Sequence, residues 1–231
     1  MLYGYGWSNE ILLITLAMMV IPLYASFKVQ STFNIYSRKK TLSGYTGEEA
    51  ARRILAINHI DIPIQPVRGS MTDFYNPLNK TLALSETVYG VDSIAALGVA
   101  AHEAGHAIQD ANHYAFLRFR HAIYPMTNFA SRVSMPLIFI GLFFGSMPFL
   151  VDLGIGLFAI TTIFAIVTLP VEFNASKRAL ATLESSGILA PEELKGAKKV
   201  LDAAALTYVA AAMASILSLI RLIMISNNNN D

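Results

Sequence analysis

Five consecutive residues carry the clearest chemistry in this chain: His102-Glu103-Ala104-Gly105-His106. Side chains four positions apart lie one above the other on the same face of a helix, so the two histidines can bind one metal ion between them. The glutamate beside them can accept and donate a proton, and this H-E-x-x-H spacing is typical of zinc hydrolases. The pattern therefore predicts hydrolysis assisted by a metal ion. The alternative is a helix whose two histidines share no ligand.

The segment around this motif is expected to be helical. Ser93 or Asp92 can serve as the N-cap, and a run without proline follows from Ile94 to Gln109. Gly105 inside this helix costs about 1 kcal/mol relative to alanine. A glycine at that position indicates the close approach of another helix or of a substrate.

Catalytic zinc sites use three protein ligands and leave a fourth position for water, so one ligand must come from elsewhere in the chain. We predict Glu172, because it lies at the end of a long apolar segment, where a carboxylate needs a stabilising partner. The alternative is an acid near a helix start, since Pro170 suits a first turn. His113 and His121 follow the motif and are rival ligands. His59 is expected to lie at a helix end.

The chain is unusually apolar, with 54% hydrophobic residues. A membrane-spanning helix needs about 20 apolar residues. Four charge-free windows of 17 to 19 residues approach that length: Ile11–Phe27, Val133–Val151, Leu153–Val171 and Ala203–Ile220. The alternatives are buried core helices and, for the first window, a signal peptide, although its N-terminal flank has no Lys or Arg. The sequence therefore predicts a mainly α integral membrane protein with about four transmembrane helices.

The placement of charge predicts the orientation in the membrane. Of 17 Lys and Arg residues, 16 lie in Lys28–Arg132 and Lys177–Lys199. The positive-inside rule assigns both segments to the cytoplasm and both termini to the other side. The run Arg38-Lys39-Lys40 is expected to face anionic lipid headgroups. A net charge of +1 gives no indication of nucleic acid, and the absence of cysteine excludes disulfides and thiolate zinc ligands.

These boundaries divide the chain into six predicted segments. They are a first transmembrane helix (residues 1–28), a cytoplasmic subdomain with the motif helix (29–132), a transmembrane hairpin (133–171), a cytoplasmic segment with the third ligand (172–202), a fourth transmembrane helix (203–225) and a disordered tail (226–231). Both predicted cytoplasmic segments carry a metal ligand, which a shared ion requires.

The segment between the first span and the motif predicts a small subdomain. The predicted elements are a helix at Gly47–Asn58, an extended segment at Ile62–Val67, turns at Thr72–Asn79 and a strand at Thr81–Leu84. Thr46 and Glu49 have the spacing of a capping box, which starts the helix. We expect the two extended segments to form a two-stranded β-hairpin with a free edge, to which an extended peptide can bind. The alternative is a purely structural hairpin.

The stretch from Thr72 to Arg221 resembles the YugP-like family of bacterial membrane zinc metallopeptidases. The resemblance rests on Asp73–Pro77, Leu84–Tyr89, Val99–Gln109, Thr168–Arg178 and Ala203–Ala210. More distantly, the layout is similar to the HtpX and prenyl-protein protease group, which also places two spans between H-E-x-x-H and a glutamate ligand. The glutamate motif of that group is E-x-x-A-D, and Ser176 stands here where its aspartate would stand.

The resemblance implies a gluzincin-like zinc peptidase. Its Zn²⁺ ligands would be His102, His106 and Glu172, with Glu103 as the general base. The expected substrates are membrane or membrane-proximal proteins, cleaved at the cytoplasmic face of the bacterial cytoplasmic membrane. The expected partners are therefore a protein or peptide substrate and the lipid bilayer, with no nucleic acid.

The resemblance also implies residues around the ligands. The aspartate of the related group orients a ligand histidine, so Ser176 or Asn174 is expected to take that role here. Tyr208 is a candidate donor to the developing oxyanion, and the alternative is an interfacial tyrosine. An inactive zinc-binding scaffold that binds partners is the alternative function, although a purely structural site needs no base such as Glu103. A metal transporter would carry ionisable residues within several spans, and these windows carry almost none.

Overall fold

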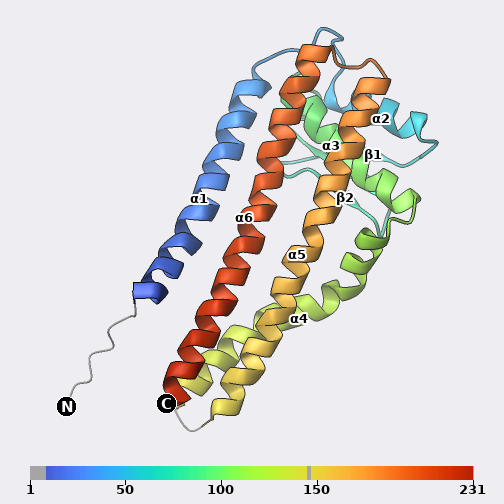
Figure 1. Cartoon of the computed structure of the whole chain (residues 1–231). Coiled ribbons are helices and arrows are strands. Elements are labelled where there is room, and N and C mark those ends of the chain that lie inside the picture. Colours follow the sequence, from blue (N-terminus) through green and yellow to red (C-terminus); the bar gives the residue numbers. More distant parts are fainter. Residues whose placement is uncertain (1–8, 145–146, 231) are drawn as a thin grey trace. The chain divides into compact units, whose positions relative to one another are not determined.

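The computed structural model describes residues 9–144 and 147–230 (Figure 1). Within these residues the chain forms six helices and one small sheet, which confirms the predicted mainly α class. The helices are α1 (Asn9–Ser37), α2 (Gly47–Ile57), α3 (Ile94–Ala111), α4 (Ala115–Phe144), α5 (Pro148–Ser185) and α6 (Pro191–Asn230). The strands are β1 (Ile64–Val67), β2 (Phe74–Asn76) and β3 (Thr81–Ser85).

Four of these helices, α1, α4, α5 and α6, are long and apolar enough to cross a membrane. Their most apolar windows have mean hydropathies of 2.0, 1.3, 2.3 and 2.1. Only 11% to 28% of the residues in these windows are buried inside the protein. A helix that faces lipid needs such outward apolar side chains, because the hydrocarbon core of the bilayer is apolar. The helix satisfies its own backbone groups by hydrogen bonds within it. The prediction of four candidate membrane-spanning helices is confirmed.

The connection between the second and third spans differs from the prediction. α4 ends at Phe144 and α5 begins at Pro148, so Asp152 lies inside α5 and not in the connection. Proline suits the first turn of a helix, where its missing N–H has no intrahelical partner to lose. Asp152 is exposed, and its carboxylate accepts a hydrogen bond from Ser226 Oγ at 3.5 Å.

Two helices also continue past their predicted ends. α5 passes through Pro170 without a break. The alternative explanation of Glu172, an acid near a helix that starts at Pro170, is therefore wrong. α6 is helical up to Asn230, where the sequence predicted a disordered tail from residue 226. Asp231 lies outside the described residues.

The described residues form two compact units. The first combines Met1–Ser26, Phe119–Thr168 and Thr207–Asp231, as far as these segments are described. The second, called the site unit below, combines Phe27–Arg118 and Leu169–Leu206. The site unit contains α2, α3, the sheet and Glu172, and it therefore holds every predicted metal ligand except the rival His121.

The sheet has three strands in the order β1-β3-β2, so the predicted two-stranded hairpin is wrong. β1 and β3 pair in parallel, with Ile64 opposite Leu82, and a parallel pair cannot be a hairpin. The hairpin is instead formed by β3 and β2, which pair antiparallel with Tyr75 opposite Leu82. β2 has only three residues and ends at Asn76, and Pro77 and Asn79 follow directly. The turn signals of these residues predicted a turn where the structure has a strand.

The two helices of the subdomain begin where their caps predict. Thr46 Oγ1 accepts from the Glu49 N–H, and the Glu49 carboxylate accepts from the Thr46 N–H, so the capping box of α2 is confirmed. Ser93 Oγ accepts from the Ala96 N–H at 3.2 Å and is the N-cap of α3. These caps satisfy N–H groups that have no carbonyl partner in the first turn. A buried apolar core from α2, α3 and β3 then fixes the motif helix against the sheet.

Gly105 allows α5 to approach the motif helix closely. A Cβ atom on Gly105 would lie 2.6 Å from the Ala175 carbonyl oxygen and 3.3 Å from the Ala175 Cα. A carbonyl oxygen of a helix backbone cannot move aside as a flexible side chain can. The close approach predicted from this glycine is therefore that of another helix, and it brings the ligand-bearing turn of α5 against α3.

We expect Gly105→Ala to destabilise the site unit. The overpacking costs about 1–3 kcal/mol, which exceeds the gain of about 1 kcal/mol from a better helix former. Thermal unfolding of the detergent-solubilised chain measures the difference. The matched control is Gly156→Ala, a helical glycine with open space around its Cβ position, which should be neutral or stabilising. Equal melting temperatures for the two variants would contradict the close-packing argument.

Candidate metal centre

Two helices that are distant in the sequence bring the predicted ligands together. His102 and His106 lie one turn apart on α3, and Glu172 lies on α5. Glu172 Oε2 lies 3.2 Å from His102 Nε2 and 3.5 Å from His106 Nε2. One ligand atom from each residue lies within 4.8 Å of the others. In the described part of the chain, these three residues are the one group of His, Cys, Asp and Glu side chains that converges in this way.

The donors and the burial of this group suit a divalent cation. Two imidazole nitrogens and one carboxylate oxygen are the donor set of a catalytic zinc site with an open fourth position. The side chains are 12% exposed for each histidine and 3% exposed for Glu172. Burial alone would lower the pKa of His106, but the hydrogen bond with Glu172 and the charges of Glu103 and Glu172 outweigh it and raise that pKa. A site that stabilises a proton between carboxylates also stabilises a metal ion that replaces it.

Each candidate ligand histidine has a partner on its other ring nitrogen. His102 Nδ1 lies 3.1 Å from Ser176 Oγ, and His106 Nδ1 lies 3.0 Å from Gln109 Oε1. An amide oxygen only accepts hydrogen bonds, so the contact with Gln109 puts the proton of His106 on Nδ1. Nε2 of His106 then keeps its lone pair for a metal ion, and the ring is fixed in orientation.

Gln109 itself is completely buried and fully bonded. Its Nε2 donates to the Val171 carbonyl oxygen at 2.7 Å and to Asn174 Oδ1 at 3.1 Å, which determines which side of the amide faces His106. Asn174 Oδ1 also accepts from Arg178 Nε at 2.7 Å. The structure thus places Ser176 in contact with His102, whereas Asn174 contacts Gln109 and not a candidate ligand.

Gln109 was not predicted, although its signal is present in the sequence. It follows His106 by three positions, and side chains three apart lie on the same face of a helix. Its second set of contacts, to Val171 and Asn174 on α5, has no local signal, because 62 to 65 residues separate the partners.

Glu103 lies beside the candidate ligands as a buried carboxylate, 9% exposed. Its Oε2 accepts a hydrogen bond from the backbone N–H of Tyr75 in β2 at 3.1 Å. A buried carboxylate is costly unless hydrogen bonds compensate it. The edge strand therefore supplies a partner for the candidate base, and nothing in the sequence around the motif indicated this contact.

The rival residues are placed elsewhere. His113 follows the end of α3 with a left-handed backbone (φ 52°), and His59 has the same conformation after α2 (φ 56°). Both histidines are exposed, and neither belongs to the group of His102, His106 and Glu172. His121 and Tyr208 lie in the other compact unit, so the oxyanion role of Tyr208 stays a prediction.

We expect Gln109→Leu to weaken zinc binding by about 10- to 100-fold, since outer partners of zinc ligands commonly contribute that much. Leucine keeps the shape but removes the acceptor at His106 Nδ1. Ser176→Ala should have a smaller effect in the same direction, because a hydroxyl is a weaker partner than an amide oxygen. Titration against a coloured zinc chelator measures both affinities. Ser185→Ala, an exposed serine on the same helix as Ser176, is the control; an unchanged affinity in Gln109→Leu would contradict the assignment.

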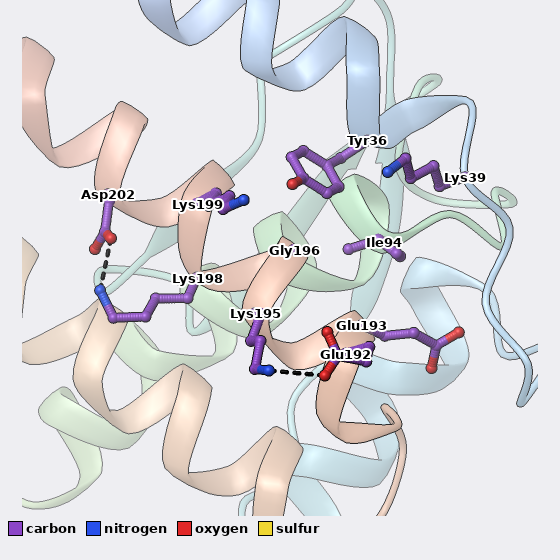
Figure 2. Close-up of a pocket in the computed structure, with 10 residues that line it drawn as sticks. All are labelled: Tyr36, Lys39, Ile94, Glu192, Glu193, Lys195, Gly196, Lys198, Lys199 and Asp202. Atoms are coloured by element: carbon purple, nitrogen blue, oxygen red, sulfur yellow. Dashed lines mark hydrogen bonds and ion pairs between the residues drawn. The ribbon is translucent and has the colours of Figure 1, made fainter.

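The site unit also contains a cavity of about 650 Å³ away from any histidine (Figure 2). It lies between the last turn of α1, the first turn of α3 and the first turns of α6. Two of its lysines pair along α6, with Lys195 Nζ 2.7 Å from Glu192 and Lys198 Nζ 2.6 Å from Asp202. The described residues that line it offer no imidazole, so it does not repeat the donor set of the candidate metal centre.

Comparison with known proteins agrees with this geometry. Residues 11–227 match the family model described as "Putative neutral zinc metallopeptidase". The chain belongs to this family. The match covers the four candidate spans, the motif helix and Glu172, and it confirms the resemblance found in the sequence.

A curated relative points the same way. The chain is 49% identical over 220 residues to the "Putative membrane protease YugP" of Bacillus subtilis (strain 168), an alignment that covers 94% of this chain and 97% of the relative. No solved structure matches the chain. Family membership and the four apolar helices together make this a membrane protein of a zinc metallopeptidase family.

Proposed function

We propose that this chain is a zinc-dependent endopeptidase that hydrolyses peptide bonds of membrane or membrane-proximal proteins at the cytoplasmic face. The observation that carries the proposal is the convergence of His102, His106 and Glu172, with ligand atoms within 4.8 Å of one another, beside the buried carboxylate of Glu103. The description of the family supports the same function.

The residues of the site have separate roles in such a reaction. His102, His106 and Glu172 would hold a zinc ion, which when bound supplies Lewis acidity and lowers the pKa of a water molecule to about 7. Glu103 takes the proton of the attacking water and delivers it to the leaving amine. The Tyr75 N–H holds one oxygen of Glu103 at 3.1 Å, so that the other oxygen can face the reacting water.

Strand β2 offers an edge for an extended peptide substrate. Opposite residues of an antiparallel pair alternate between bonding each other and pointing their N–H and C=O groups away. Tyr75 lies opposite Leu82. The Leu82 N–H donates to the Pro63 carbonyl oxygen and the Tyr75 N–H donates to Glu103, so these two residues do not bond each other. The Tyr75 C=O therefore points away from β3 on the same side as Glu103. We propose that it accepts a hydrogen bond from a backbone N–H of the substrate.

The cytoplasmic location rests on the distribution of Lys and Arg, 15 of which lie in the two predicted segments that carry the ligands, residues 29–132 and 172–202. A reporter enzyme fused after Ile225 should therefore read as non-cytoplasmic, and one fused after Leu42 should read as cytoplasmic. Alkaline phosphatase and a fluorescent protein provide opposite readouts at each position. A cytoplasmic signal after Ile225 would overturn the four-span orientation.

Metal analysis and proteolysis of the detergent-purified full chain test the proposed function. We expect about one zinc per chain and cleavage of an unfolded casein-type substrate. A zinc chelator should stop the cleavage and added zinc should restore it. Cleavage that is indifferent to the chelator, or zinc-loaded protein that cleaves no substrate, would contradict the proposal.

A further inference from the structure

One residue of the edge strand contacts the motif helix at two points. The Tyr75 N–H donates to Glu103 Oε2 at 3.1 Å, and the Tyr75 hydroxyl donates to Asp110 Oδ2 at 2.6 Å. Glu103 and Asp110 are seven residues apart on α3, which is two turns and about 10 Å along the helix axis. The backbone and the side chain of Tyr75 thus lie along one face of α3, with the candidate base at one end and Asp110 at the other.

The turn after β2 adds a second contact to the Asp110 carboxylate. Lys80, which has a left-handed backbone (φ 51°) just before β3, forms an ion pair with Asp110. The Asp110 side chain is 19% exposed, whereas that of Lys80 is 56% exposed. Asp110 therefore accepts from both ends of the β2–β3 turn, once from the strand and once from the residue that closes the turn.

The Tyr75 hydroxyl is protonated over the physiological pH range. Burial, together with the hydrogen bond to Asp110, raises the pKa of Tyr75 far above its ordinary value, so the phenol remains a donor. β2 itself has only three residues, and its pairing with β3 supplies few hydrogen bonds to fix the distance between β2 and α3. The contacts with Asp110 tie the far end of the Tyr75 side chain to α3, in addition to its packing against the apolar core.

We propose that Asp110, the Tyr75 hydroxyl and Lys80 form a clamp that sets the Tyr75 N–H against Glu103 and so holds the base in its working orientation. This inference rests on the proposed function and adds positioning residues to it. The clamp touches neither the metal ligands nor the reacting atoms. It acts on the reaction through the placement of β2, which carries both the partner of the base and the carbonyl proposed for substrate.

The test uses Tyr75→Phe and Asp110→Asn in the full-length, detergent-purified chain. Both variants should retain about one zinc per chain, and kcat should fall roughly tenfold or more while KM rises less than kcat falls. The double variant should lose less than the two single losses combined, because Tyr75→Phe removes the donor of a hydrogen bond whose acceptor Asp110→Asn deprives of its charge. The matched control is Asp202→Asn, which breaks an ion pair of Lys198 on α6 and should leave kcat unchanged.

Hydrogen–deuterium exchange separates a failed clamp from a failed function. The amides of Phe74–Asn76 should exchange at least tenfold faster in Tyr75→Phe and Asp110→Asn, and at the wild-type rate in Asp202→Asn. Unchanged exchange would overturn the clamp, and so would faster exchange with an unchanged kcat. If the wild-type protein cleaves nothing, the proposed function has failed, and the exchange data alone decide whether the clamp exists.

Discussion

The Glu103→Gln variant is expected to retain its zinc and to lose peptide hydrolysis by at least about a thousandfold, within the range that a general base contributes. Glutamine has nearly the same shape and can still accept the hydrogen bond from the Tyr75 N–H, which lies 3.1 Å from the carboxylate. It cannot take up the proton of the attacking water. The variant therefore removes the proton transfer and keeps the packing around it.

Initial rates on a casein-type substrate and metal analysis of the same samples check this result. Glu86→Gln, an exposed glutamate of the same compact unit, is the control and should behave as wild type. Activity above a tenth of the wild-type rate would contradict the assignment of the base. Loss of zinc from the variant would mean that Glu103 contributes to metal binding and not to proton transfer.

Glu172→Ala should reduce zinc affinity more than the loss of any outer partner does, by well over a hundredfold. The carboxylate is one of three donors, its Oε2 is 3.2 Å and 3.5 Å from the two histidine Nε2 atoms, and its side chain is 3% exposed. Removing it leaves two imidazoles, which do not complete a three-ligand zinc site. Competition with a coloured chelator gives the affinity directly.

Glu184→Ala provides the matched control, because Glu184 lies on the same helix as Glu172 but is exposed. This control should bind zinc as wild type does. One zinc per chain at wild-type affinity in Glu172→Ala would exclude this residue as the third ligand and would return attention to His113 and His121.

The centre of the site was predictable from the sequence because its signals are local. The spacing of His102 and His106 requires one face of a helix, and the cap at Ser93 and the absence of proline up to Gln109 indicated that helix. Glu172 was predictable from its place at the end of an apolar segment. A carboxylate there needs a stabilising partner, whatever the fold around it.

The surroundings of the site could not be predicted, because they depend on contacts between distant segments. The Tyr75 N–H reaches Glu103 across 28 residues, and Gln109 reaches Val171 across 62. The parallel pairing of β1 with β3 is also non-local, and nothing in two short apolar runs specifies the direction in which they pair. Hydropathy located the spans but not the end of α4 or the start of α5, since the residues on both sides of that connection are apolar.

The three-residue edge of β2 has a consequence for selectivity under the proposed function. Of the backbone groups on its outer side, the Tyr75 N–H is already bonded to Glu103, which leaves the Tyr75 C=O to bond a substrate. One such hydrogen bond contributes about 1 kcal/mol, which raises the affinity for a substrate roughly fivefold. A main-chain hydrogen bond contributes affinity without distinguishing side chains, so this edge by itself holds an extended chain weakly and does not select one amino-acid sequence over another. Under the proposed function, a substrate would therefore have to bring to this edge an extended segment whose own backbone groups are free to pair.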